Sequence, residues 1–353
     1  MKQLLSITAK KLTPYQWEEI PVGKTYRFDT NTLPIPPQSL TEFLDTMKNN
    51  CPINEYTDPS YSTLKTLIAS YEQVQPGQIT VTNSGDEAID ILAKAFLNPG
   101  DLFITTPPTY EMFTIQCSIN RGVPYDIPLS ANKFELDKNT IIRISNKPNV
   151  KLLFLVNPNN PTGSVIEPSI LENIIQKAGC MVVVDEVYRE FYGKSVVSLI
   201  QKYTNLVILR SLSKFAGIAG ARVGYLLANE VYTKIFNAIR LPMGVSYLSS
   251  QLACFVLKND TSWMQKQIQV IIRERSRITK ALSSLGLTVY PSQANFLLVN
   301  TGKHVPALSA KLKKQNIIVR NLDAKRYLNG CIRITIRNPM ENDILIQACK
   351  GIV

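Results

Sequence analysis

The sequence predicts an α/β protein with a large domain, built on a mostly parallel central sheet covered by helices, and a smaller α+β domain. Between residues 78 and 211, apolar runs rich in β-branched residues alternate with helical segments, which is typical of parallel strands joined by covering helices. From residue 241 the pattern changes to two long amphipathic segments followed by short strands. The 353 residues, 45% of them hydrophobic, are enough to form a large and a small core.

The first predicted strand and helix follow each other directly. QITVTNS (78–84) predicts a strand, and GDEAIDILAKAFLNPG (85–100) predicts a helix with two acids in its first turn and an apolar stripe. Four more apolar runs predict strands buried on both faces, at 101–108, 151–158, 180–187 and 205–211. Ligands bind at the carboxyl ends of such strands, so we expect the functional residues there.

The last third of the chain predicts a second, smaller unit. Helices are expected at 246–258 and 261–285, and short strands at 294–300, 316–321 and 331–337. We therefore predict an N-terminal segment over 1–40 that packs on the small domain and on a partner chain, a large domain over 41–240, and a small domain over 241–353.

Composition excludes several classes of protein. No apolar run approaches the roughly 20 residues of a membrane helix, and the first residues lack the apolar core of a secretory signal, so we expect a cytoplasmic protein without membrane contact. Six isolated cysteines and a single histidine, His304, favour free thiols and no metal site. The net charge of +12 is spread along the chain, which favours small anionic substrates over nucleic acid.

The turn NSGDEA (83–88) predicts a phosphate site. It leads from a strand into a helix, so the free N–H groups of Gly85 and Asp86 point outward at the positive end of the helix dipole. The turn lacks the glycine patterns of nucleoside-triphosphate and dinucleotide loops. Ser211, Ser213 and Arg222 follow another strand and add donors suited to a phosphate monoester.

An amine is expected beside that phosphate. Lys214, in SLSKFAGIAGARVGY (211–225), is predicted to lie in a crowded site, where desolvation favours its neutral, nucleophilic form, which is able to form a Schiff base. Asp185 ends a buried strand and needs a cation, either a core arginine or a protonated pyridine nitrogen.

Three further side chains complete a cofactor site. Tyr188 and Asn160 are able to hydrogen-bond a phenolate oxygen, and Tyr110 offers a ring for stacking, although ordinary packing is an alternative for it. Phosphate, aldehyde carbon, phenolate, ring nitrogen and ring face each have a candidate partner. Pyridoxal 5′-phosphate (PLP) is the cofactor that carries all five features.

These motifs carry a resemblance to a known family. NPNNPTG (157–163), VVVDEVYREF (182–191) and SLSKFAGIAGARVGY resemble the fold-type I PLP-dependent aminotransferases in order and spacing. NSGDEAI (83–89) and INEYTDPSYSTLK (53–65) narrow the resemblance to the histidinol-phosphate aminotransferase family. The family implies that Lys214 is the Schiff-base lysine that also moves the proton.

The resemblance also implies the surrounding contacts. Asp185 would face the pyridine nitrogen, and Tyr188 would act with Lys214 and Asp185 in catalysis. Tyr56 would reach the phosphate in the neighbouring subunit, which implies a homodimer with shared sites, although a turn residue within its own subunit is an alternative for it. The cofactor contacts implied within one subunit are Gly85, Asp86, Tyr110, Asn160, Asp185, Tyr188, Ser211, Ser213, Lys214 and Arg222.

By the same resemblance, the expected reaction belongs to histidine biosynthesis. It exchanges an amino group between histidinol phosphate, or a related amine, and 2-oxoglutarate by a ping-pong mechanism. Tyr15, Arg320 and Arg333 would bind the substrate, the two arginines together suiting a phosphate dianion. Arg333 alone would serve an α-carboxylate equally well.

Three stretches depart from the family pattern near the substrate pocket: NTLP (31–34), LPMGVS (241–246) and Arg337, where a glycine is usual. An aminotransferase of aromatic or other amino acids is therefore an alternative. A threonine-phosphate decarboxylase shares the fold but typically has alanine at Gly217. A non-catalytic regulatory protein on this fold would be expected to lack Lys214.

Overall fold

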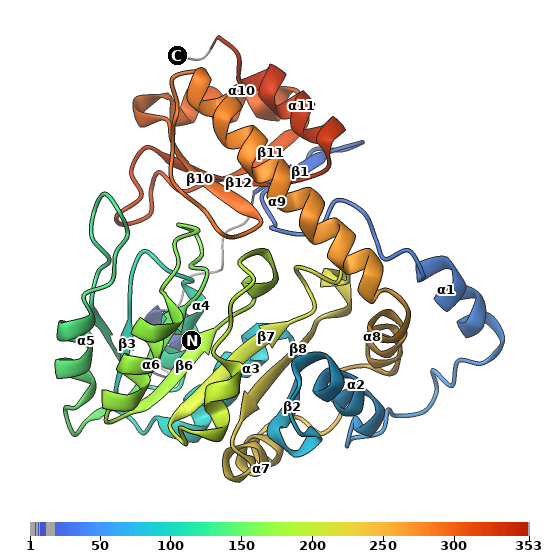
Figure 1. The fold of residues 1–353 in the computed structure, drawn as a ribbon, viewed down its shortest axis with the longest axis vertical. Helices are drawn as coiled ribbons and strands as arrows, with labels where there is room; N and C mark the ends of the chain where they lie inside the picture. Colours follow the sequence, from blue (N-terminus) through green and yellow to red (C-terminus); the bar gives the residue numbers. More distant parts are fainter. Residues whose placement is uncertain (1–3, 5, 7, 12–17, 352–353) are drawn as a thin grey trace.

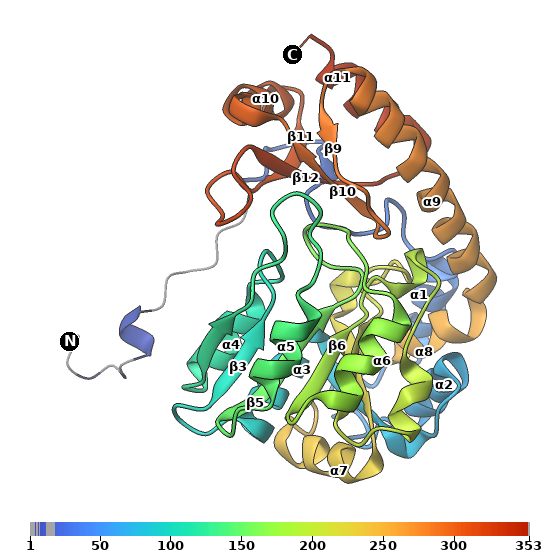
Figure 2. The same cartoon turned by 60° about the vertical axis from the view of Figure 1, so that its left-hand side comes forward.

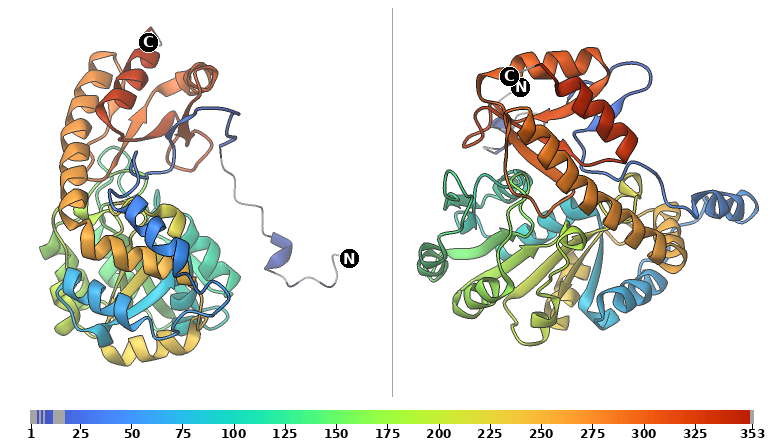
Figure 3. Two further views of the ribbon diagram at one scale, coloured as in Figure 1. Left: turned by 90° about the vertical axis from the view of Figure 1, so that its right-hand side faces the viewer. Right: turned by 45° about the horizontal axis from the view of Figure 1, so that its top comes forward.

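The computed structural model describes residues 4, 6, 8–11 and 18–351. Figure 1 shows a large lobe below and a smaller lobe above, each built around its own sheet. The long helix α9 (Thr261–Ser284) runs from one lobe to the other, as the two views of Figure 3 also show. None of the described helices is long and apolar enough to cross a membrane.

The large lobe contains a seven-stranded sheet in the order β2-β8-β7-β6-β5-β3-β4. Neighbouring strands from β7 to β4 are parallel, and only β8 runs against both of its neighbours, β2 and β7. The strands are β2 (Ile79–Asn83), β3 (Leu102–Thr105), β4 (Val123–Asp126), β5 (Val150–Val156), β6 (Met181–Asp185), β7 (Leu206–Ser211) and β8 (Val223–Ala228). The predicted α/β class with a mostly parallel sheet is confirmed.

Helices cover both faces of this sheet, so successive strand residues enter different cores. Val183 of β6 packs in the core beneath α3, α4 and α7, whereas Val182 and Val184 pack in the core beneath α2, α5, α6 and α8. The helices of this lobe, including α1 at its edge (Figure 2), are α1 (Leu40–Asn49), α2 (Ser62–Glu72), α3 (Ser84–Phe96), α4 (Met112–Ile119), α5 (Lys138–Ser145), α6 (Pro168–Lys177), α7 (Glu230–Ile239) and α8 (Tyr247–Asn259).

The small lobe contains a five-stranded sheet in the order β1-β11-β12-β10-β9. Its first strand comes from the N-terminal part of the chain and pairs in parallel with β11, with Phe28 opposite Val319. The elements are β1 (Tyr26–Phe28), β9 (Thr288–Val289), β10 (Phe296–Asn300), β11 (Ile317–Asn321) and β12 (Cys331–Thr335), with α10 (Val305–Lys314) and α11 (Pro339–Cys349).

The predicted strands are found within a few residues of their expected bounds, but two strands of the large sheet were not predicted. β4 is a partly exposed edge strand that contains Pro124, so it lacks the apolar run of a central strand. β8 is fully buried, but it begins directly after a glycine-rich turn that we interpreted only for its chemistry. The domain boundaries after residues 40 and 240 stay a prediction.

Candidate active site

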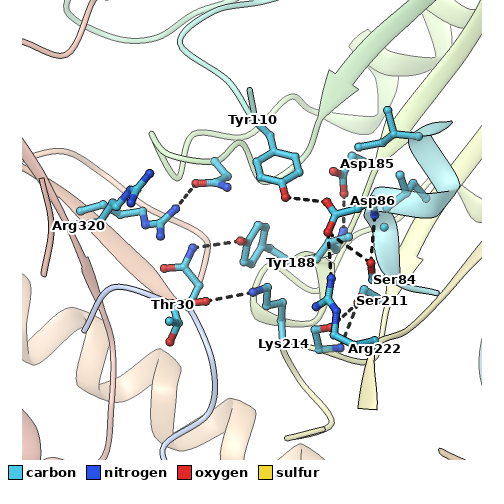
Figure 4. Close-up of a pocket in the computed structure, with 18 of the residues that line it drawn as sticks. Thr30, Ser84, Asp86, Tyr110, Asp185, Tyr188, Ser211, Lys214, Arg222 and Arg320 are labelled. Atoms are coloured by element: carbon cyan, nitrogen blue, oxygen red, sulfur yellow. Dashed lines mark hydrogen bonds and ion pairs between the residues drawn. The ribbon is translucent and has the colours of Figure 1, made fainter. Parts of the chain in front are cut away.

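A cavity of about 360 Å³ lies where the carboxyl ends of the large sheet face the small lobe. The ends of β6 and β7, the first turn of α3 and the segment after β1 form its walls, and β11 and β12 add Arg320 and Arg333. Figure 4 shows these side chains converging from both lobes on one space. This placement agrees with the expectation that the functional residues lie at the carboxyl ends of the strands.

One end of the cavity is suited to an anion. The N-terminus of α3 faces this end. The same space is lined by the guanidinium of Arg222 and by the hydroxyls of Ser84, Ser211 and Ser213. The Ser211 and Ser213 hydroxyls are 2.9 Å apart. Hydroxyl groups, a helix N-terminus and a guanidinium together favour a phosphate.

Tight packing fixes the turn at the start of α3. Ser84 has a φ of +69°, in the left-handed region that a serine rarely adopts. β8 passes so close that a Cβ atom on Gly224 would lie 2.6 Å from the carbonyl carbon of Ser84. Only glycine leaves room for this approach, so Gly224 allows the turn and the amides after it to pack against the sheet.

Lys214 lines the cavity. Its Nζ donates a hydrogen bond to the backbone oxygen of Thr30 at 3.1 Å. Burial, with help from the nearby charges of Arg333 and Arg222, lowers the pKa of this amine to about 8. The neutral amine, which is the nucleophilic form, is therefore more populated near neutral pH than in an ordinary lysine.

Asp185 lies at the end of β6 and is 6% exposed. Its Oδ1 accepts a hydrogen bond from the backbone N–H of Val187 at 3.0 Å, and burial raises the pKa of the carboxyl to about 7. The ion pairs of the buried Arg210 are made with other carboxylates, including Glu186 at 2.8 Å. The carboxyl of Asp185 is thus placed to favour a cationic ligand atom.

Hydrogen bonds orient the remaining candidates. Asn31 donates through Nδ2 to the Tyr188 hydroxyl at 3.0 Å, and Arg333 donates through Nη1 to Asn160 Oδ1 at 2.7 Å. The Tyr110 hydroxyl lies 2.9 Å from Asp86 Oδ1. These contacts hold polar groups on several sides of the cavity.

The structure brings most of the predicted site residues together. Those that line the cavity are Gly85, Asp86, Tyr110, Asn160, Asp185, Tyr188, Ser211, Ser213, Lys214, Arg222, Arg320 and Arg333. Tyr56 lies elsewhere in the same chain, with a side chain that is 86% exposed. Tyr15 lies outside the described residues, and the roles assigned to all of these residues stay predictions.

The contribution of the segment after β1 was not predicted from the sequence. Thr30 and Asn31 contact Lys214 and Tyr188, yet NTLP was noted only as a departure from the family pattern. Arg337, another departure, contacts β1 itself by donating to the backbone oxygen of Arg27 at 3.1 Å, and it pairs with Glu341. The asparagine in NTLP was the available signal, but its partner is 157 residues away in the sequence.

The donor set fits PLP. The cavity offers an anion site, an amine with a lowered pKa and a buried carboxyl, together with polar groups suited to a phenolate oxygen. Such a set on an α/β sheet defines an enzyme that binds PLP through an amine and a phosphate. The chain belongs to the family of class I and II aminotransferases, whose model matches residues 24–349. It is a PLP-dependent aminotransferase, which confirms the predicted class, enzyme type and cofactor.

Curated relatives match the whole chain. The histidinol-phosphate aminotransferase of Thermoanaerobacter pseudethanolicus is 36% identical over 355 residues, with 100% of this chain and 99% of the relative covered. The enzyme of the same name from Caldanaerobacter subterraneus is 34% identical with the same coverage. The resemblance found in the motifs is therefore confirmed.

Solved structures share the fold. Histidinol-phosphate aminotransferase from Sinorhizobium meliloti, in complex with PLP, matches with a TM-score of 0.88 at 22% identity, covering 99% of this chain and 97% of that one. L-threonine-O-3-phosphate decarboxylase from Porphyromonas gingivalis matches with a TM-score of 0.77 at 25% identity, covering 92% and 98%. The fold is thus common to enzymes with different reactions.

Proposed function

We propose that this aminotransferase exchanges an amino group between histidinol phosphate and 2-oxoglutarate, as part of histidine biosynthesis. Arg320 of β11 and Arg333 of β12 are opposite each other in neighbouring strands, and both line the cavity that contains Lys214. This observation carries the proposal. Two guanidinium groups suit a phosphate dianion better than a single carboxylate. The names of the full-length relatives support the same substrate.

The chain's own residues would divide the chemistry among them. When bound, PLP supplies an electron sink that stabilises negative charge on the substrate carbon. Lys214, with its pKa of about 8, would remove the proton from that carbon and deliver it to the former aldehyde carbon of the cofactor. Asp185 would face the ring nitrogen, and Tyr188 and Asn160 would hydrogen-bond the phenolate oxygen. The donor and the 2-oxo acid would occupy the same cavity in turn.

The phosphate of the cofactor would be held by backbone and side chains together. The amides of Gly85 and Asp86 lie at the N-terminus of α3, and Ser211, Ser213 and Arg222 line the same end of the cavity. Tyr110 would stack on the ring. These contacts would leave the arginines of the small lobe for the substrate.

A homodimer with shared sites belongs to this proposal. α1 projects from the body of the molecule in Figure 1, and its Leu44 is 53% exposed. Ile53 and Tyr56, which follow α1 in the sequence, are also exposed, and so is Leu248 on α8. A partner subunit would cover them and would bring Tyr56 to its phosphate. The cytoplasmic location stays a prediction that cell fractionation would test.

The two arginines provide the test of the substrate. With histidinol phosphate, Arg320→Gln and Arg333→Gln are each expected to cost roughly 1.5–3 kcal/mol in the specificity constant, because each loses a charge-assisted contact to the dianion. With an aromatic amino acid, Arg333→Gln is expected to be severe and Arg320→Gln mild. Arg273→Gln, an exposed change on α9, is the control and should resemble the parent.

Assays of the parent enzyme separate the rival functions. The expected result is transfer of the amino group from histidinol phosphate to 2-oxoglutarate, without release of carbon dioxide from O-phosphothreonine. An enzyme that uses aromatic amino acids but not histidinol phosphate would contradict the proposed substrate. Carbon dioxide release from O-phosphothreonine would instead support the decarboxylase.

A further inference from the structure

The side chain of Asp86 joins two parts of the cavity that sequence analysis treated separately. Its Oδ1 accepts a hydrogen bond from the Tyr110 hydroxyl, and its Oδ2 accepts one from Arg222 Nη2, both at 2.9 Å. Figure 4 shows the carboxylate between the two side chains. Tyr110 precedes α4 and Arg222 precedes β8, so one carboxylate connects three separate elements.

We propose that Asp86 is a positioning residue, whose carboxylate orients the Tyr110 ring and the Arg222 guanidinium for binding the ring and the phosphate of the cofactor. The inference rests on the cofactor contacts proposed above for Tyr110 and Arg222. It goes beyond them because it assigns a role to the side chain of Asp86, whereas the earlier expectation concerned only its backbone amide.

Asp86 itself is well placed to act as a fixed point. It lies in the first turn of α3, where the helix dipole favours a carboxylate. Its N–H donates to the Ser84 hydroxyl at 3.3 Å, and the Ser84 turn is packed against Gly224 of β8. A side chain that starts from a rigid turn restricts the partners that it binds.

A purely electrostatic role predicts the opposite effect on cofactor binding. A carboxylate that merely lay near the phosphate would repel it, so neutralising the carboxylate would slow cofactor release. If the carboxylate instead positions Arg222, neutralising it would speed cofactor release. The side chains of Arg222 and Asp86 are 50% and 38% exposed, so losing their ion pair should not unfold the protein.

The first experiment compares holoenzymes. Asp86→Asn keeps the size of the side chain and an oxygen that accepts from Tyr110, but it no longer pairs with Arg222. We expect PLP to dissociate about three- to fivefold faster, measured by its transfer to an excess of an apo-acceptor protein. Asp90→Asn is the matched control, because it is the same substitution in the same helix and Asp90, which pairs with Lys94, does not line the cavity. Its release rate should equal that of the parent.

The second experiment isolates the Tyr110 contact. Tyr110→Phe removes only the hydroxyl, and Asp86→Ala removes its acceptor. We expect each change to weaken the visible circular dichroism of the bound cofactor. The double variant should resemble Asp86→Ala alone, because Asp86→Ala already removes the acceptor of the Tyr110 hydroxyl.

Three outcomes would overturn the inference. The first is that Asp86→Asn releases PLP at the parent rate or more slowly. The second is that the losses of dichroism caused by Asp86→Ala and Tyr110→Phe add in the double variant. The third is that neither of these two changes alters the dichroism. In a parent that binds PLP, these results contradict the role of Asp86 alone. A parent that does not bind PLP would overturn the proposed cofactor contacts as well.

Discussion

At the scale of single residues, the site contains two ionisable groups whose pKa values are shifted in opposite directions by burial. Desolvation lowers the pKa of Lys214 to about 8 and raises that of Asp185 to about 7, because burial disfavours the charged form of each. Both pKa values are thereby brought close to neutrality. A nucleophilic amine and a carboxyl that benefits from a cationic partner are what a pyridine aldehyde requires.

The lowered pKa of Lys214 predicts a pH dependence. Because only the neutral amine attacks an aldehyde, the rate of covalent PLP capture by the apoenzyme should rise with pH, with a midpoint near 8. An exposed lysine would give a midpoint near 10.4. Stopped-flow absorbance between pH 7 and 10 measures this rate, and Lys214→Ala should show no covalent phase. A rate that still climbs steeply above pH 9.5 would contradict the assignment.

Asp185 is expected to matter more for turnover than for binding. Asp185→Asn keeps the shape of the side chain but cannot pair with a protonated ring nitrogen, so we expect turnover to fall at least about a hundredfold. The dissociation constant of PLP should change less, because the phosphate contacts are intact. Steady-state rates and PLP titration test this, and parent-like turnover would show that the ion pair is not needed.

At the scale of elements, the site is built by close approach of backbones. Strand β8 contacts the strained Ser84 turn at the N-terminus of α3, and this contact is possible because Gly224 has no side chain. Arg222, which also has a left-handed φ of +55°, enters from the turn just before β8. The glycine-rich stretch of the lysine motif therefore serves packing as well as ligand binding.

Gly224→Ala tests this close approach. The new Cβ would meet the Ser84 carbonyl carbon at 2.6 Å, the Ser84 oxygen at 2.9 Å and the Gly85 nitrogen at 3.0 Å, all of them backbone atoms. We expect the free energy of unfolding to fall by about 1–3 kcal/mol and PLP binding to weaken. Gly220→Ala, whose Cβ would meet no atom within 4 Å, is the control. Urea unfolding of the apoprotein and PLP titration measure both effects, and equal behaviour of the two variants would contradict the packing argument.

At the scale of the whole molecule, the active site depends on both lobes. β6 and β7 supply Asp185 and Ser211 to the cavity, whereas β11 and β12 supply the two arginines. The segment after β1 links the lobes, because it contacts Lys214 and Tyr188 while β1 belongs to the small sheet. The exposed Tyr56 adds the expectation that a second subunit completes the site.

Mixed dimers test the shared site. Lys214→Ala and Tyr56→Ala subunits are each expected to be poorly active alone. If Tyr56 serves the partner's site, a hybrid dimer contains one site with both native residues. Equal mixing by co-expression should then restore about a quarter of the parent activity, since half of the dimers are hybrids with one intact site of two. No recovery in hybrids isolated by two affinity tags would contradict sharing.

The sequence by itself determined the alternating strands and helices, the buried strand that ends at Asp185, and the set of residues that suits PLP. These features are local, because strand patterning and strand-end chemistry are written within a few neighbouring residues. Only the tertiary structure decided that β8 enters the sheet between β2 and β7 and that Asn31 meets Tyr188. It also placed Arg337 against the backbone of β1. Such contacts join residues more than 150 positions apart, so they depend on how the two lobes pack, which no local pattern specifies.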